Sequence, residues 1–142
     1  MLTKRQAKVF FLGGTIFFFL VFLGMSIHTL VVGIPENTNE KLITEEVKLG
    51  KLVWEQNNCM GCHTIMGEGA YYAPELTRVF SRKGPEYIKV VLNDPKGWGP
   101  RGRKMVAYDF TEKEVDGLVA FFEWMDQADL NGFPAEPSID RE

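Results

Sequence analysis

The two cysteines of this 142-residue chain lie three positions apart and are followed directly by a histidine, in the run Cys59-Met60-Gly61-Cys62-His63. A C-x-x-C-H run is typical of covalent c-type haem attachment: each thiol adds to one haem vinyl group, and the histidine then lies under the iron as its proximal ligand. The motif therefore predicts one haem c held by Cys59, Cys62 and His63, and a role in electron transfer.

Two other interpretations of a C-x-x-C pair fit this sequence less well. Half of a zinc site would need two further ligands, and the only other histidine, His28, lies far away in an apolar segment. A thioredoxin-like redox pair needs a βαβ context, and the sequence shows no such pattern.

A long apolar segment near the N-terminus predicts a membrane anchor. From Val9 to Val32 the chain has no Asp, Glu, Lys or Arg, and about 24 residues of helix reach roughly 36 Å, enough to cross a bilayer core of about 30 Å. Lys4, Arg5 and Lys8 precede the segment. Positive charge stays on the cytoplasmic side, so we expect the N-terminus to lie in the cytoplasm.

A cleaved signal peptide is the competing interpretation of this segment. Its apolar region would span about 7–15 residues and end at a small-residue cleavage site. Here the run is longer, and Val31-Val32-Gly33 is a poor cleavage site. We therefore expect a permanent anchor over 1–33, a linker over 34–43 and an exterior domain over 44–142.

The anchor and the haem motif indicate the same compartment. Haem is attached to C-x-x-C-H on the outer side of the bacterial inner membrane, and an anchor with its N-terminus inside puts Cys59 on that periplasmic side. The lack of any further cysteine suits an oxidising compartment. His28 lies near the outer end of the span, where we expect it to reach lipid headgroups or a partner helix.

The part of the chain after Gly33 is acidic. It carries all 19 Asp and Glu against 13 Lys and Arg, an excess of six negative charges. Such a surface keeps the domain soluble and can steer a cationic partner. Nucleic-acid binding is not expected, because the sequence has no basic stripe.

The exterior domain has the pattern of a small all-α unit. Thr44 is a good N-cap for a helix that should run to about Asn57 and deliver Cys59 to the haem. Pro85 suits the first turn of a second helix, which should stop before Asp94. The segments 64–83 and 94–105 are expected to be loops.

The last helix has the clearest start signal. Thr111 and Glu114 form a capping box. Apolar residues then recur at helical spacing on one face, which should be buried: Val115, Leu118, Val119, Phe122 and Met125, with Phe121 and Trp124 beside them. The tail from Asn131 should be loosely held.

These features resemble a class I cytochrome c. Gly50 and Trp54 resemble the glycine and aromatic residue of that family's first helix, and residues 117–122 look like its last helix, which crosses the first. The run 73–76 looks like the family's proline segment. The resemblance implies that the Pro74 carbonyl accepts a hydrogen bond from His63 Nδ1 and fixes the ring for iron binding.

The second axial ligand of the iron is expected to be Met105. It lies just before the last helix, where class I cytochromes place this ligand, and a thioether raises the reduction potential relative to a second histidine. If Met105 were not the ligand, the iron would be five-coordinate and open to small ligands. The other methionines lie in the membrane segment, in or just after the haem motif, or on the apolar face of the last helix: Met1, Met25, Met60, Met66 and Met125.

The run 62–76, which includes G-E-G-A-Y-Y-A-P-E-L, together with one anchor and one haem motif, resembles the family of small cytochrome c subunits of bacterial nitric oxide reductase. The basic segment 101–104 and Phe110 also fit. The resemblance implies a non-catalytic electron-entry subunit. It would take electrons from soluble periplasmic donors, a cytochrome c or a cupredoxin, and pass them to a large membrane subunit.

That large subunit is implied to hold a haem b and a haem–non-haem iron centre that reduces NO to N2O. The resemblance also implies that the backbone of Gly69 and Tyr71 faces the large subunit and helps to bind a calcium ion. Carbonyl groups of a glycine-rich loop are suitable ligands for such a hard cation.

Two other functions remain open from the sequence. A free membrane-anchored cytochrome c shuttle for a terminal oxidase or nitrite reductase would share every feature above, but it would purify without an obligate partner. A haem-based sensor would need an open position on the iron, which a six-coordinate spectrum would exclude.

Overall fold

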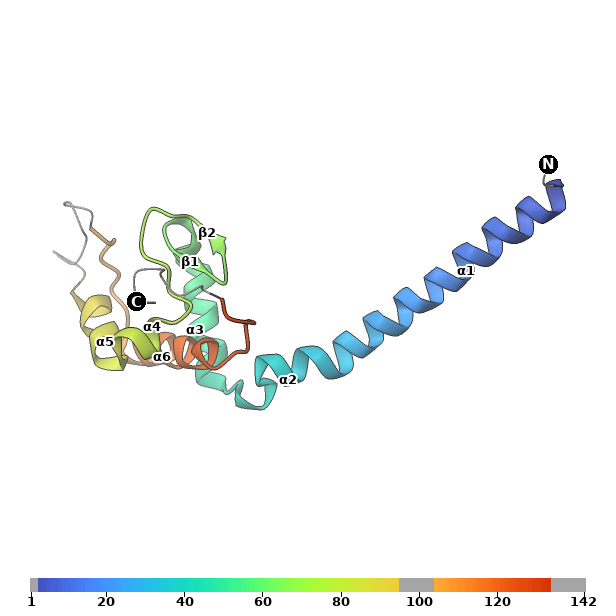
Figure 1. The fold of residues 1–142 in the computed structure, drawn as a ribbon. Coiled ribbons are helices and arrows are strands. Elements are labelled where there is room, and N and C mark those ends of the chain that lie inside the picture. The colour runs from blue at the N-terminus through green and yellow to red at the C-terminus, as the bar shows by residue number, and fades with distance from the viewer. Residues whose placement is uncertain (1–2, 95–103, 134–142) are drawn as a thin grey trace, which may run out of the picture. The chain divides into compact units, whose positions relative to one another are not determined.

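The computed structural model describes residues 3–94 and 104–133 (Figure 1). The chain divides into two compact units, residues 1–36 and 37–142. The boundary falls inside the predicted linker. Each unit is described by itself below.

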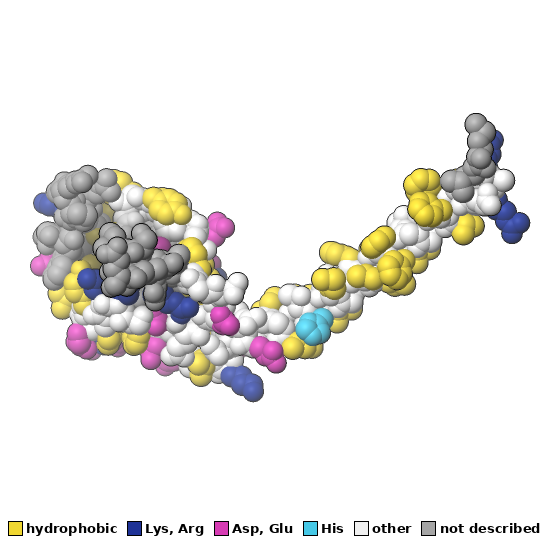
Figure 2. Space-filling model, in the orientation of Figure 1, with side chains coloured by type: hydrophobic (Ala, Val, Ile, Leu, Met, Phe, Trp, Pro, Cys, Tyr) yellow, Lys and Arg dark blue, Asp and Glu magenta, His cyan; other side chains and the backbone are white. Residues whose placement is uncertain are grey.

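The N-terminal unit is one long helix. α1 (Lys4–His28) continues through a π-helical turn, η1 (Thr29–Gly33), into α2 (Ile34–Thr38). The whole stretch Lys4–Thr38 is long and apolar enough to cross a membrane, and its apolar side chains are exposed along its length (Figure 2).

The helix is longer than the predicted span at both ends. Thr3 starts it before Val9, because its hydroxyl accepts from Gln6 N in a capping box. Beyond Val32 the helix passes Pro35, and the turn before this proline is a wide one in which Ile34 N donates to Thr29 O. Proline normally clashes with the carbonyl four residues earlier, and a wider turn moves that carbonyl away from the ring.

The second unit is confirmed as all-α, with one small hairpin. It contains η2 (Glu40–Leu42), α3 (Glu45–Gln56), η3 (Cys59–Gly61), α4 (Val79–Lys83), α5 (Pro85–Asn93) and α6 (Glu112–Asp126), with β1 (Thr64–Ile65) and β2 (Glu68–Gly69) between η3 and α4. The predicted bounds of α3, α5 and the start of α6 are confirmed.

The helices α3 and α6 cross closely, and two glycines make the crossing possible. A Cβ atom on Gly50 would overlap the carbonyl oxygen of Gly117 and lie 2.8 Å from Phe121 Cβ. A Cβ atom on Gly117 would lie 3.1 Å from Gly50 N. The two backbones therefore meet where no side chain separates them.

The hydrophobic core lies around this crossing. The predicted apolar face of α6 is buried, and Met125 is fully enclosed. Trp54 of α3 packs edge-on against Phe122, with ring centroids 5.8 Å apart. Ile88 and Leu92 of α5 complete the core.

The predicted loop over 64–83 was wrong in two places. β1 and β2 pair as an antiparallel hairpin, and its turn is made by Met66 (φ 50°) and Gly67 (φ 83°), both in the left-handed region. α4 occupies 79–83. This five-residue helix is held mainly by tertiary contacts, since Ser81 Oγ donates to Asp126 Oδ1 at 2.9 Å.

The other two loop predictions fall largely outside the described residues. Of 94–105, the structure describes residues 94, 104 and 105, none of them in a helix or strand. Of the tail from Asn131, it describes only residues 131–133, so the expected looseness stays a prediction.

Candidate functional site

The haem motif lies on a tight turn directly after α3. Asn57 closes that helix through a hydrogen bond from Nδ2 to Val53 O (2.8 Å), and Asn58 then turns the chain with φ 49°. In the following turn, Cys62 N and His63 N both donate to Cys59 O, at 3.1 and 2.8 Å. The turn therefore gathers both thiols and the imidazole within five residues.

The two thiols lie in different environments. Cys59 is part of the hydrophobic core, whereas Cys62 is exposed, and neither is in a disulfide. Burial raises the pKa of the Cys59 thiol to about 11. Reactive redox cysteines have a lowered pKa, so Cys59 does not have the electrostatics of a reactive thioredoxin-like thiol.

The zinc alternative finds no support in the described part of the chain. Within residues 3–94 and 104–133, no group of three His, Cys, Asp or Glu side chains is arranged to hold a metal ion. A structural zinc site would need four such ligands around one point.

The orientation of His63 is fixed by the proline segment. Its Nδ1–H donates to the Pro74 carbonyl oxygen at 2.8 Å, the contact that the class I resemblance implies. Burial lowers the pKa of His63, and the bond to Pro74 opposes this shift. A neutral ring with Nδ1 engaged leaves Nε2 as the nitrogen for a metal ion.

The loop from Gly69 to Pro74 wraps the haem motif. Ala70 N donates to both Met60 O (3.0 Å) and His63 O (3.2 Å), and Ala73 N donates to Cys62 O (2.8 Å). Gly69 has φ 117°, and a Cβ atom there would overlap the His63 carbonyl oxygen. This position therefore requires glycine. Tyr71, two residues further on, is 80% exposed.

The surroundings of His63 fit a large group that brings its own hydrogen-bond acceptors. Among the described residues, the buried indole nitrogens of Trp54 and Trp124 have no hydrogen-bond partner. The Trp54 ring lies 6.2 Å from the His63 ring, centroid to centroid. An unpaired buried N–H is costly, and the carboxylates of a haem are suitable acceptors. The donor set and the unpaired Trp54 nitrogen beside His63 therefore fit haem c.

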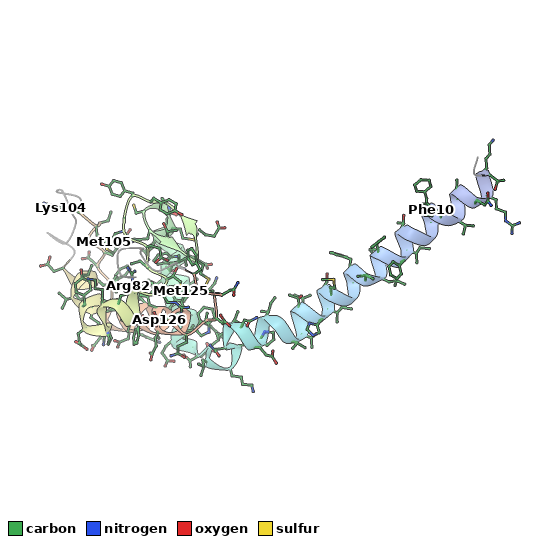
Figure 3. All side chains as sticks on the ribbon, viewed as in Figure 1. Phe10, Arg82, Lys104, Met105, Met125 and Asp126 are labelled. Carbon is green, nitrogen blue, oxygen red and sulfur yellow. The ribbon has the colours of Figure 1, made fainter. Side chains whose placement is uncertain are left out.

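Met105 lies in the coil before α6, next to Lys104 (Figure 3). It is half-buried and packs against the hydrophobic core. Met125, at the far end of α6, is fully buried, as its place on the apolar face predicted. Met60 and Met66 are exposed.

Sequence reasoning missed Tyr108 as a residue near the haem motif. Its hydroxyl donates to Asn57 O at 3.4 Å, and its ring stacks on Phe110 with centroids 4.9 Å apart. Burial is the main cause that raises the pKa of Tyr108. An aromatic residue three positions after Met105 was the only signal in the sequence.

Comparison with known proteins shows the family. The cytochrome c family matches residues 47–126. The chain is 46% identical to the C subunit of nitric oxide reductase from Stutzerimonas stutzeri over 138 residues, which covers 93% of each chain. Against the same subunit from Halomonas halodenitrificans, identity is 41% over 96% of this chain and 97% of the relative.

The chain belongs to the family of nitric oxide reductase C subunits. The C subunit from Paracoccus denitrificans is a further relative, 36% identical over 94% of this chain and 95% of its own length. The resemblance inferred from the 62–76 run, the cytochrome c domain and the electron-transport role are thereby confirmed.

Membership in this family agrees with the geometry of the site. Its members are cytochrome c components of an enzyme complex, which supports covalent haem c as the cofactor of this chain. Cytochrome c oxidase subunit 2 of Alkalihalophilus pseudofirmus is also similar, with 30% identity over 81 residues, but these make up only 23% of that protein. This similarity reaches half of the chain, whereas the similarity to the nitric oxide reductase relatives reaches nearly all of it.

Proposed function

We propose that this chain is the electron-entry subunit of a nitric oxide reductase. It takes electrons from soluble periplasmic donors, a cytochrome c or a cupredoxin, and passes them to a large catalytic membrane subunit. The observation that carries the proposal is the nearly full-length similarity to the C subunit of nitric oxide reductase. The His63–Pro74 hydrogen bond beside a C-x-x-C pair supports it.

The residues of the site have distinct roles in this proposal. A haem c bound here supplies one-electron transfer. Cys59 and Cys62 hold it through thioether bonds, one haem for the single C-x-x-C-H motif. His63 Nε2 and the Met105 thioether would coordinate the haem iron, and Pro74 O would hold the His63 ring in place.

This ligand set explains why the chain would not itself reduce nitric oxide. With His63 and Met105 both bound, the iron would have no open position for a substrate, and the chemistry supplied here would be outer-sphere electron transfer. Reduction of NO to N2O then belongs to the large subunit, with its haem b and haem–non-haem iron centre.

The loop over 67–75 is the proposed docking surface for the large subunit. It lies directly against the haem motif through the bonds of Ala70 and Ala73, and Tyr71 projects from it. In this proposal the backbone carbonyls of Gly69 and Tyr71 contribute to a calcium site shared with the partner.

The long N-terminal helix is proposed to anchor the chain in the bacterial inner membrane. Lys4, Arg5 and Lys8 would keep the N-terminus in the cytoplasm, and the domain over 44–142 would then lie in the periplasm. The helical turns over 34–43 connect the two parts.

A charge on the docking loop should uncouple the two subunits. We expect Tyr71→Glu to lower NO turnover with a cytochrome donor by at least about tenfold, because a buried interface charge without a partner costs about 1.4 kcal/mol or more. The haem spectrum should not change, since Tyr71 is 80% exposed. Val90→Glu, at an exposed position of α5, is the matched control and should keep turnover.

Co-purification with the large subunit separates loss of assembly from loss of electron transfer. If Tyr71→Glu binds the large subunit and keeps full turnover, the loop is not the docking surface. If the wild-type chain purifies from native membranes alone and monodisperse, it is a free shuttle and the proposed function is wrong.

A further inference from the structure

The geometry of the hydrogen bond from His63 to Pro74 depends on how firmly the backbone around Pro74 is held in place. Pro74 lies in an irregular segment between β2 and α4. The backbone on its C-terminal side is tied to β1, because Leu76 N donates to Thr64 O at 2.9 Å. Three polar side chains add further bonds at the same place: Glu75, Thr77 and Arg82.

Thr77 is the centre of this cluster. Its side chain is fully enclosed, with no exposed surface. The Thr77 hydroxyl donates to Glu75 Oε1 and accepts from Met66 N at 2.7 Å. Thr77 N donates to the same carboxylate oxygen, also at 2.7 Å.

The partners of the Thr77 hydroxyl lie on the two segments that carry His63 and Pro74. Met66 lies three residues after His63, and Glu75 directly follows Pro74. One buried hydroxyl therefore joins the segment that carries the imidazole to the segment that carries its acceptor.

Arg82 fixes the cluster from the other side. Its Nη2 donates to the Glu75 carbonyl oxygen at 2.5 Å and lies 3.7 Å from Glu75 Oε2. Arg82 Nε donates to Arg78 O at 3.2 Å. The Arg78 guanidinium in turn donates to the carbonyl oxygens of Asp126 and Ala128 at the end of α6. Figure 3 shows Arg82 and Asp126 in this part of the domain.

We propose that Thr77 and Glu75 are positioning residues that hold the Pro74 carbonyl against His63 Nδ1–H and thereby set the reduction potential of the haem. The bond to Nδ1–H makes the imidazole a stronger electron donor. A stronger donor stabilises oxidised iron and lowers the potential. Loosening the cluster should therefore raise the potential.

The inference rests on the proposed role of His63 as an iron ligand, and the experiment tests the two separately. Three variants of the full chain with its haem are compared: Thr77→Val, which removes the hydroxyl at nearly constant volume; Thr77→Ser, which keeps it; and Thr64→Val. Thr64 is equally buried, lies next to His63 and bonds Ala70 O instead, so it controls for the loss of any buried hydroxyl here.

Two quantities are measured, the reduction potential and the exchange rate of the His63 Nδ1 proton by NMR. Removing an outer-shell partner of a metal-bound histidine typically changes metal affinity or activity by about tenfold or more. We therefore expect Thr77→Val to lower the oxidised-to-reduced ratio of the haem about tenfold at a given solution potential. This corresponds to a rise in the reduction potential of about 59 mV for one electron. Its Nδ1 proton should exchange faster. Thr77→Ser and Thr64→Val should stay near the wild type in both.

The inference is overturned if Thr77→Val only lowers the unfolding free energy while its potential and proton exchange match the wild type. It is also overturned if Thr77→Ser or Thr64→Val shifts both quantities as much as Thr77→Val. If the wild-type protein shows no low-spin, six-coordinate haem spectrum, the ligand assignment and the proposed function are wrong instead.

Discussion

His63 shows how a single residue acquires its chemistry from its surroundings. Burial lowers its pKa, so the ring is neutral near pH 7. The Pro74 carbonyl selects the tautomer with the proton on Nδ1. A free histidine would sample both tautomers and both charge states, whereas this one presents a single nitrogen lone pair.

Met105→Ala should remove the sulfur ligand from the iron. We expect it to abolish the weak near-infrared sulfur-to-iron band of the oxidised protein and to lower the reduction potential, because the thioether favours reduced iron. Absorption spectra of the oxidised protein measure this directly.

Two other methionines serve as controls for that change. Met66→Ala removes an exposed side chain and should leave the band and the stability unchanged. Met125→Ala should cost about 2–5 kcal/mol of unfolding free energy, because it opens a cavity in the core, yet keep the band. A band that survives in Met105→Ala would show that another residue is the ligand.

The sequence predicts some residues of the site better than others. Cys59, Cys62 and His63 form a local motif whose spacing is itself the signal. Thr77 and Tyr108 carry no such signal, because their roles depend on contacts with residues 11 and 51 positions away. Such contacts follow from the folded path of the chain and not from any periodicity.

At the scale of elements, the α3–α6 crossing depends on Gly50. A methyl group there would overlap the Gly117 carbonyl, so Gly50→Ala should force the helices apart and cost about 1–3 kcal/mol. Urea unfolding followed by haem absorbance measures the loss. Lys51→Ala, an exposed neighbour on α3, should stay within about 0.5 kcal/mol. Equal stability of Gly50→Ala and the wild type would contradict the close crossing.

The capping box of α6 should make its stability sensitive to acid. The backbone N–H of Thr111, and then its hydroxyl, lower the pKa of Glu114. Because the folded pKa lies below the unfolded one, ionised Glu114 stabilises the fold above about pH 4.3, and this contribution is lost as the pH falls through the folded pKa.

Glu114→Gln removes that ionisation. Its stability deficit relative to the wild type should be present at pH 7 and shrink below about pH 4, as measured by unfolding at a series of pH values. A Glu114→Gln deficit that stays constant into acid would refute the role of the carboxylate.

The sequence predicts those helices that have their own local signals, a cap and an apolar face. α3 and α6 have caps and an apolar face, and both lie where expected. α4 has five residues and depends on Ser81 and Arg78 contacts to the end of α6, which no window of sequence contains. The hairpin turn at Met66 and Gly67 lacks the usual Asn-Gly signature.

At the scale of the molecule, the chain combines a helix with no buried residues and a compact acidic domain (Figure 2). A helix with exposed apolar side chains along its length suits lipid, and the charge excess of the domain suits a cationic donor. This organisation suits the proposed role, in which the chain takes electrons from soluble donors and passes them to a membrane subunit.

The production of N2O from NO tests whether this chain is the electron-entry subunit of a nitric oxide reductase. With a natural cytochrome donor, we measure it for this chain alone, for the large subunit alone and for the two combined. We expect turnover only in the combined sample, with activity restored when this chain is added back to the large subunit. N2O from this chain alone, or full activity of the large subunit without it, would show that this chain is not the electron-entry subunit.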